Sequence, residues 1–483
     1  MHRLLPPLLR PLHSDEYLPV PPHRALSRAT HRVAAGLPDV ARAVGMEPDA
    51  YAYDRRATAL ALRAIDTAHG GGCYAVDPDA PFDLGALPSR SGAEASRAAA
   101  SPADNREHLL ASGGAEGAVV DVQTHLVDPE LWVGRHAAAL GMFLELGDPD
   151  RWAGGVDPRR IDAAAWAALV FGGSETAVAL LTSTPGPPGH NVLENAQIAA
   201  VRDVTDRYAG TGRVLTHTIV HPNLGPAELD RMVEWARMLR PSAWKVYTLA
   251  GPPTAASPTG GWFLDDAEVG SPFLERVGEL GPRIVCAHKG LGGPIPDASV
   301  AAASPRDIGP AAAAFPDVTF VVYHSGYERN PDGEEGAFDP IAPAGVDRLI
   351  ASCAAHGIGP GANVYAELGS TWFLVLRRPV EAAHVLGKLL VHFGAERILW
   401  GTDCTWYGSP QPLIDAFRAF TIPERMQAEF GYPPLTDAVK DRILGANAAE
   451  LYGIDPTGLT IPADVPVAEL APALLAAIDA ART

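Results

Sequence analysis

The stretch Val119-Val120-Asp121-Val122-Gln123-Thr124-His125 decides the fold of this chain. It is a short apolar run in which Asp121, Gln123 and His125 stand at alternate positions. Because alternate residues of a β-strand face the same side, we expect these three side chains to point together while the valines pack outward. A strand that ends in polar, metal-capable side chains is typical of a barrel that presents ligands at the C-terminal ends of its strands.

The rest of the chain repeats this pattern, because short apolar strands alternate with helix-patterned segments from residue 118 onward. Such alternation is typical of β/α units and a parallel sheet. Eight strands in about 285 residues predict a (β/α)8 TIM barrel, with a doubly wound sheet as the alternative. The strand candidates are 118–125, 177–182, 214–221, 243–248, 283–288, 318–324, 363–368 and 397–403. The helical stretches between them include 226–239, 347–356, 380–393 and 412–420.

The chain divides into three parts by composition. Residues 1–115 are rich in Ala, Pro, Arg and Gly and predict an N-terminal extension or cap with one helix at 54–69; a partly disordered arm is the alternative. Residues 116–455 hold the predicted barrel, whose last helix is expected at 437–451. Residues 456–483 predict a C-terminal helical tail.

The composition is that of an ordinary globular protein, with 483 residues, 47% hydrophobic and 20% charged. Its 38 basic and 57 acidic residues give a formal charge of −19, which argues against a nucleic-acid or anionic-membrane partner because no basic surplus exists to neutralise phosphates. Four widely separated cysteines without a CxxC spacing favour reduced thiols. No signal peptide or membrane span is expected, so the sequence predicts a cytoplasmic protein.

Metal-capable or polar residues stand at the ends of four predicted strands. Gln123 and His125 end the first strand, His288 the fifth, His324 the sixth and Asp403 the eighth. In a barrel these positions surround one mouth, so residues far apart in sequence become neighbours. Imidazoles and one carboxylate suit Zn²⁺, or another first-row ion such as Mn²⁺, with one position left for water. His324 and Asp403 are also suited to general acid–base catalysis.

Further side chains are candidates for substrate binding. Lys245 and Tyr247 share one face of the fourth strand and are suited to a carboxylate or oxyanion; a lysine that turns its head outward is the alternative. Glu367 on the seventh strand is a candidate contact or a brace for the site. Trp406 and Tyr407, past the eighth strand, are candidates for an aromatic wall. A lone strand-end histidine is more often structural than a ligand, but the combined set reverses that preference.

These residues carry a resemblance to the amidohydrolase superfamily, specifically its amidohydrolase-2 group, which includes aminocarboxymuconate-semialdehyde decarboxylase and related hydrolases. The likeness spans residues 118–455, and its segments are jointly specific although each alone is weak. The matching segments are 121–125 (DVQTH), 284–290 (IVCAHKG), 321–326 (VVYHSG), 399–403 (LWGTD) and 443–452 (ILGANAAELY).

The resemblance implies that His125, His288 and Asp403 hold one divalent metal ion, and that His324 contacts the reacting group or helps to activate water. Relatives usually open the first strand with His-x-His, whereas Gln123 stands at the first of these positions here. An amide oxygen is a weaker ligand than an imidazole, so Gln123 is either a marginal fourth ligand or a brace. Some decarboxylating relatives also depart from His-x-His, and the substitution slightly favours that alternative.

The expected function is hydrolysis of an amide, lactam or ester bond in a small organic molecule by metal-activated water. The alternatives are non-oxidative decarboxylation of an aromatic or enamine carboxylic acid with the same metal set, and an inactive barrel that only binds a ligand. A carboxylated Lys245 that bridges two ions is a further variant. Related barrels often dimerise, so a homodimer is expected, with the apolar run 372–376 as a candidate contact.

Overall fold

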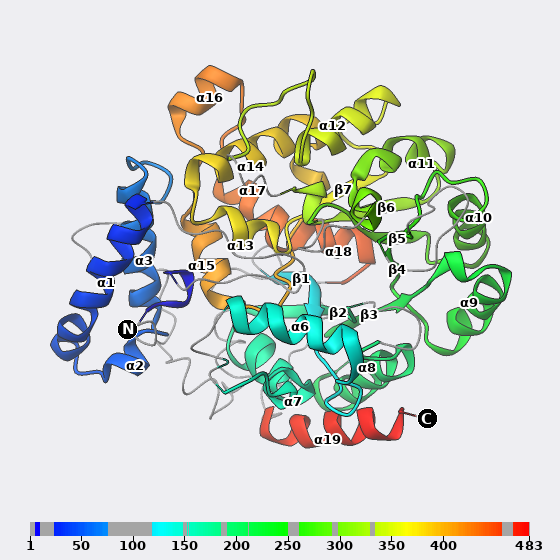
Figure 1. Ribbon diagram of the computed structural model, residues 1–483, viewed down its shortest axis with the longest axis horizontal. Helices are drawn as coiled ribbons and strands as arrows, with labels where there is room; N and C mark the ends of the chain where they lie inside the picture. The colour runs from blue at the N-terminus through cyan, green and yellow to red at the C-terminus, as the bar shows by residue number, and fades with distance from the viewer. Residues whose placement is uncertain are drawn as a thin grey trace.

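The computed structural model describes residues 5–9, 24–75, 118–147, 152, 154–184, 191–210, 212–249, 260–291, 298–328, 334–455 and 467–482. Eight parallel strands form one sheet in the order β1 to β8, so each strand pairs with its neighbour in sequence. The chain beyond β8 lies beside β1, where the Asp403 N–H donates to the Gln123 carbonyl at 2.9 Å. The predicted (β/α)8 barrel is therefore confirmed (Figure 1). The strands are β1 Val119–His125, β2 Thr176–Thr182, β3 Val214–Ile219, β4 Ala243–Tyr247, β5 Ile284–His288, β6 Thr319–Tyr323, β7 Val364–Glu367 and β8 Ile398–Leu399.

Helices surround the sheet (Figure 1). The predicted helices recur with ends shifted by one or two residues, except that the segment expected at 437–451 is divided by a π-helical turn, η11 Arg442–Ala446. The principal helices of the barrel are α6 Gly134–Gly147, α7 Ala163–Ala167, α8 Asn195–Ala209, α9 Pro226–Met238, α10 Gly270–Leu280, α11 Ile308–Ala314, α12 Val346–Ala355, α13 Thr371–Val375, α14 Pro379–Phe393, α15 Gln411–Ala419, α16 Glu424–Phe430, α17 Asp437–Asp441 and α18 Asn447–Tyr452. Short turns that bear on the site are η7 Ala298–Ala303, η8 Pro305–Asp307 and η9 His324–Gly326.

Strand β1 contains an irregularity that corrects one expectation. Its register against β2 shifts by one residue in the middle of the strand, as in a β-bulge. Val122 therefore lies with the residues that fill the barrel interior, and the carboxylate of Asp121 accepts hydrogen bonds from the N–H and hydroxyl of Thr402 at 3.0 and 2.5 Å. Only Gln123 and His125 reach Asp403. The expectation of one shared face is wrong, because the extra residue reverses the alternation of side chains.

A group of N-terminal helices packs beside α15 (Figure 1). It comprises α1 Arg24–Ala43, α2 Pro48–Tyr51 and α3 Arg55–Ala68, whereas the sequence predicted only the last of these. The guanidinium of Arg55 donates two hydrogen bonds to Asp415 of α15, at 2.9 and 2.5 Å. The cap is therefore attached to the barrel by a buried, charged contact. The proposed boundary at residue 115 lies outside the described residues.

The C-terminal helix α19, Val467–Ala480, packs against α7 and α8 (Figure 1). Its buried Leu470 and Leu474 belong to the apolar cluster between those helices. Beyond its end, the guanidinium of Arg482 donates to both oxygens of Asp128, at 2.6 and 2.7 Å. Because Asp128 follows β1 by three residues, this contact fixes the loop next to His125. In the described ranges, no helix has the length and apolarity needed to span a membrane.

The apolar run proposed as a dimer contact lies inside the chain. It forms α13, where Trp372 and Phe373 are 1% and 2% exposed. The Trp372 indole N–H donates to the Leu413 carbonyl at 3.0 Å, and the Tyr74 hydroxyl donates to the Leu376 carbonyl at 2.5 Å. The proposed contact is therefore wrong, because α15 and the N-terminal segment already cover these residues.

Candidate active site

Side chains from three strand ends meet at the carboxylate of Asp403, which is 1% exposed. Nε2 of His125 lies 2.8 Å from Oδ1, and the amide of Gln123 donates to the same oxygen at 3.1 Å. The hydroxyl of Ser370 donates to Oδ2 and lies 2.7 Å from the hydroxyl of Tyr407. Both carboxylate oxygens are therefore engaged.

These contacts set the charge of Asp403. Burial alone would raise its pKa, but the hydrogen bond and charge of His125 and the Ser370 hydroxyl lower the pKa to about 2. Asp403 is thus a carboxylate at neutral pH. It is the anionic centre around which the neighbouring donors are arranged.

The histidine that ends β5 and the histidine that follows β6 form a second group. Nδ1 of His324 lies 2.7 Å from the carbonyl oxygen of Gly369, so this nitrogen carries a proton. Nε2 of His324 is then an acceptor, and the proton of His288 Nδ1, 3.1 Å away, fills this contact. The lone pair of His288 therefore remains on Nε2. Burial and the charge of Lys245 lower the pKa of His288 well below its ordinary value, so the ring is neutral.

The residues expected to bind substrate surround these two groups. The rings of Tyr247 and His288 have centroids 4.3 Å apart, and those of Trp406 and His125 are 5.5 Å apart. The ammonium of Lys245, 2% exposed, lies 3.4 Å from the ring centroid of Tyr323. The structure therefore places aromatic rings and one buried cation next to the histidines.

Glu367 has a bracing position. Its carboxylate accepts the backbone N–H groups of His324 at 3.0 Å and Gly369 at 2.5 Å. Burial raises its pKa to about 8, against the opposing effect of those two hydrogen bonds. This placement agrees with the alternative that Glu367 holds the site together, because its oxygens join the loops after β6 and β7.

The distances between the side chains around Asp403 show whether they could bind a metal ion. Among the described residues, no three His, Cys, Asp or Glu side chains are grouped closely enough to bind a cation. Three atoms nevertheless lie close together. Oδ1 of Asp403 is 2.8 Å from Nε2 of His125 and 3.1 Å from the amide nitrogen of Gln123. The last two atoms are 3.5 Å apart. Two ligands that are each about 2.1 Å from one ion are separated by about 3 Å.

Rotation of the Gln123 amide completes this set. The rotation brings Oε1, a buried atom with no hydrogen-bond partner in the described chain, to the place of the amide nitrogen. One amide oxygen, one imidazole and one carboxylate would then face a common point. The residues present therefore fit a divalent ion, although His288 is paired with His324 in this structure.

Backbone strain is concentrated at the same mouth. Six non-glycine residues of the described chain have a positive φ, and four of them lie here: His324 (65°), Ser325 (53°), Ser370 (53°) and Asp403 (63°). Each such position costs on the order of 1–3 kcal/mol and persists only where surrounding contacts hold it. This grouping of strained residues indicates that the strand ends are shaped for function.

Ser370 is the site residue that the sequence analysis missed. It lies three positions after Glu367, in a loop that carries no metal-ligand pattern. A single serine after a glycine has no distinctive spacing, so its chemistry is not visible in the sequence. Its place just beyond a strand end, where barrel loops carry functional residues, is the one available signal.

Gly401 is required by the close approach of two side chains. A Cβ there would overlap Oε1 of Glu367 and lie 3.2 Å from Cβ of Gln123. We expect Gly401→Ala to lower the free energy of unfolding by roughly 1–3 kcal/mol, because the packed neighbours must shift. Urea unfolding measures this change. Gly359→Ala is the matched control, since nothing lies within 4 Å of a Cβ there; equal losses in the two variants would contradict the prediction.

The family of the chain follows from a comparison of its sequence. The model of the Amidohydro_2 family, described as amidohydrolase, matches residues 120–454. The chain therefore belongs to this family, and is an enzyme of the amidohydrolase superfamily. This result confirms the resemblance seen in the strand-end motifs. No curated protein matches the chain.

Several solved structures are similar to the chain at low identity. The 2,6-dihydroxybenzoate decarboxylase from Rhizobium is 14% identical, with a TM-score of 0.43 over 70% of this chain and 99% of that one. The 5-carboxyvanillate decarboxylase from Novosphingobium aromaticivorans, with bound manganese, is 11% identical, with a TM-score of 0.42 over 70% and 98%. Amidohydrolase 2 from Bifidobacterium longum is 13% identical, with a TM-score of 0.34 over 70% and 99%.

Proposed function

We propose that this enzyme removes the carboxylate group of a small aromatic or enamine carboxylic acid without oxidation, with the help of a divalent metal ion. The engagement of Asp403 carries the proposal: His125 and Gln123 occupy one of its oxygens and Ser370 the other. Hydrolysis needs a group that accepts a proton from the attacking water. A carboxylate bonded on both oxygens is poorly placed for this, whereas decarboxylation needs no water as a nucleophile.

The roles of the residues follow from their positions. His125, Asp403 and Oε1 of Gln123 would hold the ion, with the lone pair of His288 Nε2 as a further ligand. A zinc or manganese ion supplies a Lewis acid for an oxygen of the substrate. The ammonium of Lys245, whose charge acts on His288, favours an anionic substrate.

The proton balance of the reaction is simple. The bond between the substrate carbon and its carboxylate breaks, CO2 leaves, and one proton takes its place on that carbon. His324 would first take up this proton from solvent at Nε2 and then give it to the carbon, because its Nδ1 is held by the Gly369 carbonyl. Tyr247 and Trp406 would orient the substrate and exclude water, since their rings lie against His288 and His125.

Hydrolysis, the function expected from the sequence, is the second candidate. The observation in its favour is the row of hydroxyls from Tyr407 through Ser370 to Asp403. Such a row offers a path along which a proton from water could leave. His324 or Asp403 would then manage the proton.

Two substrate panels separate the candidates. One contains carboxylated aromatic and enamine acids, and the other contains amides, lactams and esters. CO2 release without a hydrolysis product supports decarboxylation, and turnover confined to the second panel overturns it. Metal analysis tests the third candidate, an inactive barrel that only binds a ligand. This candidate is favoured if the purified protein holds less than about a tenth of an equivalent of metal and added Zn²⁺ or Mn²⁺ does not raise that content. About two equivalents would support a carboxylated Lys245 between two ions.

Gln123→His is expected to raise the affinity for Zn²⁺ by about tenfold or more, because an imidazole nitrogen is a better ligand than an amide oxygen. Competition with a chromogenic chelator measures the affinity. Gln427→His is the control, since it adds a histidine on α16 outside the site. An unchanged affinity in Gln123→His would show that residue 123 braces Asp403 and does not contact the ion.

A homodimeric state and a cytoplasmic location also remain predictions. The acidic formal charge of −19 supports a small-molecule substrate over a polyanionic partner. Sedimentation at several protein concentrations tests the dimer; a single monomer mass throughout would exclude it.

A further inference from the structure

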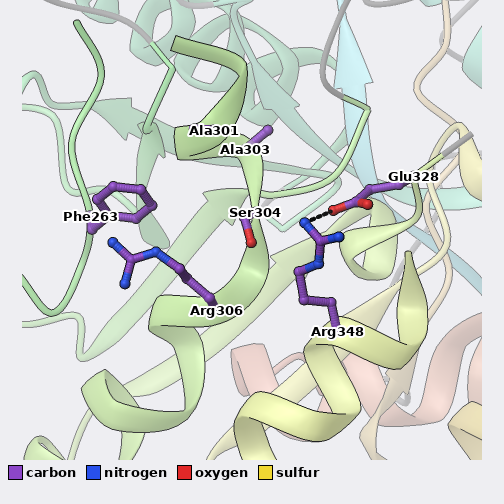
Figure 2. A pocket seen from close by; sticks show the side chains of 7 residues that line it. All are labelled: Phe263, Ala301, Ala303, Ser304, Arg306, Glu328 and Arg348. Atoms are coloured by element: carbon purple, nitrogen blue, oxygen red, sulfur yellow. Dashed lines mark ion pairs between the residues drawn. The ribbon is translucent and has the colours of Figure 1, made fainter. Parts of the chain in front are cut away.

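A cavity of about 390 Å³ lies near the loops that follow β5 and β6 (Figure 2). None of the residues placed in the candidate active site is among those that line it. The lining combines two guanidinium groups, one carboxylate, one hydroxyl and apolar side chains. The residues are Phe263, Ala301, Ala303, Ser304, Arg306, Glu328 and Arg348.

The two arginines are held differently. The guanidinium of Arg306 lies 3.7 Å above the ring of Phe263, and its nearest charged partner, Asp265, is 3.9 Å away. The side chain of Arg306 is 54% exposed, so its charge is available to a ligand. Stacking on the ring orients the guanidinium without using its N–H groups, which remain available as donors.

Arg348 stands on the other side of the cavity, where its Nη1 lies 3.1 Å from Oε1 of Glu328. In Figure 2, Ser304 lies between the two arginines. Two guanidinium groups and a hydroxyl around one space are the donors that carboxylates and phosphates bind. The lining itself holds two positive charges and one negative charge, and Asp265, 3.9 Å from Arg306, is not part of it.

The loops that follow β5 and β6 pack closely against each other beside the cavity. A Cβ on Gly290, two residues after His288, would collide with the backbone of Gly326 and Tyr327. Gly326 in turn packs against Pro305, because a Cβ there would lie 2.8 Å from the proline ring. The loops after β5 and β6 therefore touch each other directly, and the residues that line the cavity are distinct from those of the candidate active site.

We propose that this cavity is a second binding site, for a small anion with a carboxylate or phosphate group. Arg306 and Arg348 would bind the anionic group from two sides, and Ser304 would donate its hydroxyl. Ala301 and Ala303 line the cavity with apolar surface, which suits a small organic body behind the charged group. Glu328 competes with the ligand for Arg348, so its charge sets the affinity.

Titration calorimetry at constant ionic strength tests the proposal, with inorganic phosphate and benzoate as separate probes. Wild-type protein is expected to bind at least one of them with a dissociation constant of about 1 mM or tighter. Arg306→Gln and Arg348→Gln should each weaken binding at least about tenfold, because each removes a charge-assisted contact. Glu328→Gln should tighten binding about threefold or more, since it removes the competing carboxylate.

Arg276→Gln is the matched control, because Arg276 on α10 forms ion pairs of similar length at the surface. Binding of phosphate alone points to a phosphate group in the natural ligand, and binding of benzoate alone points to a carboxylate. The proposal is overturned if neither probe binds below about 10 mM, or if both arginine variants bind as the wild type does. Loss of binding in His125→Ala but not in Arg306→Gln would place the anion in the active site and would also overturn it. The ion pair of Arg306 with Asp265 is long, at 3.9 Å, and Arg306 is half exposed, so its variant remains informative if Arg348→Gln fails to fold.

Discussion

Asp403→Asn is expected to lower turnover at least about 1000-fold while the chain stays folded. An asparagine has the same shape, but one of its two terminal atoms is a donor. Since His125 and Gln123 donate to one oxygen of Asp403 and Ser370 to the other, the new N–H2 group must face one of these donors. The charge that anchors the cluster is lost at the same time, and with it a ligand for the metal ion.

Turnover is measured on the substrate that the two panels identify, together with the metal content of the purified variant. Asp415→Asn is the matched control, because Asp415 is also buried but bonds Arg55 outside the site. The control should lose stability and keep its turnover per folded molecule. An Asp403→Asn variant that retains more than about a tenth of wild-type turnover would contradict the central role of this carboxylate.

Asp307→Ala is expected to lower the free energy of unfolding by about 3–5 kcal/mol, because it leaves the charge of Lys289 buried without its partner. The two side chains are 0% exposed, and Nζ lies 2.8 Å from Oδ2. The same carboxylate oxygen accepts the N–H of Leu264 at 2.7 Å, so a second buried donor loses its acceptor. Urea or guanidinium unfolding gives the difference directly.

A double variant separates the charge from the packing. Lys289→Met combined with Asp307→Asn removes both charges, keeps a similar volume and leaves an amide oxygen to accept the Leu264 N–H, so it should recover most of the stability lost in Asp307→Ala. If Asp307→Ala alone lowers the free energy of unfolding by less than about 1 kcal/mol, water must reach the Lys289 ammonium in solution. Because Lys289 directly follows His288, the Asp307→Ala variant is also expected to bind metal more weakly.

Most of the barrel could be predicted from the sequence, because short apolar runs alternate with helix-patterned segments along it. Prediction failed where long-range pairing decides the local structure. The segment 397–403 was expected to be one strand, but only Ile398–Leu399 pair as a strand. Beyond them the chain turns beside β1, where Thr402 bonds Asp121 and Asp403 bonds the backbone of Gln123. That turn depends on contacts some 280 residues away, which no local pattern records.

For the candidate site, the residues could be predicted from the sequence but their contacts could not. His125, His288, His324 and Asp403 could be chosen because each ends a strand predicted from the sequence, and the structure brings them to one mouth. Their pairing could not be chosen, since it depends on ring orientations set by the Gly369 carbonyl and by the bulge in β1. The roles of these residues in binding metal remain predictions.

The contact between Asp128 and Arg482 has a consequence for biosynthesis. The two residues are 354 positions apart, whereas the Asp128 N–H bonds the Val192 carbonyl and the Asp128 carboxylate accepts from Gln197, both in the second β/α unit. A nascent chain can therefore hold this loop through its first β/α units, but the charged contact of Asp128 forms only after α19 and Arg482 have been synthesised. The loop next to His125 would then reach its final geometry only after the core of the barrel has formed.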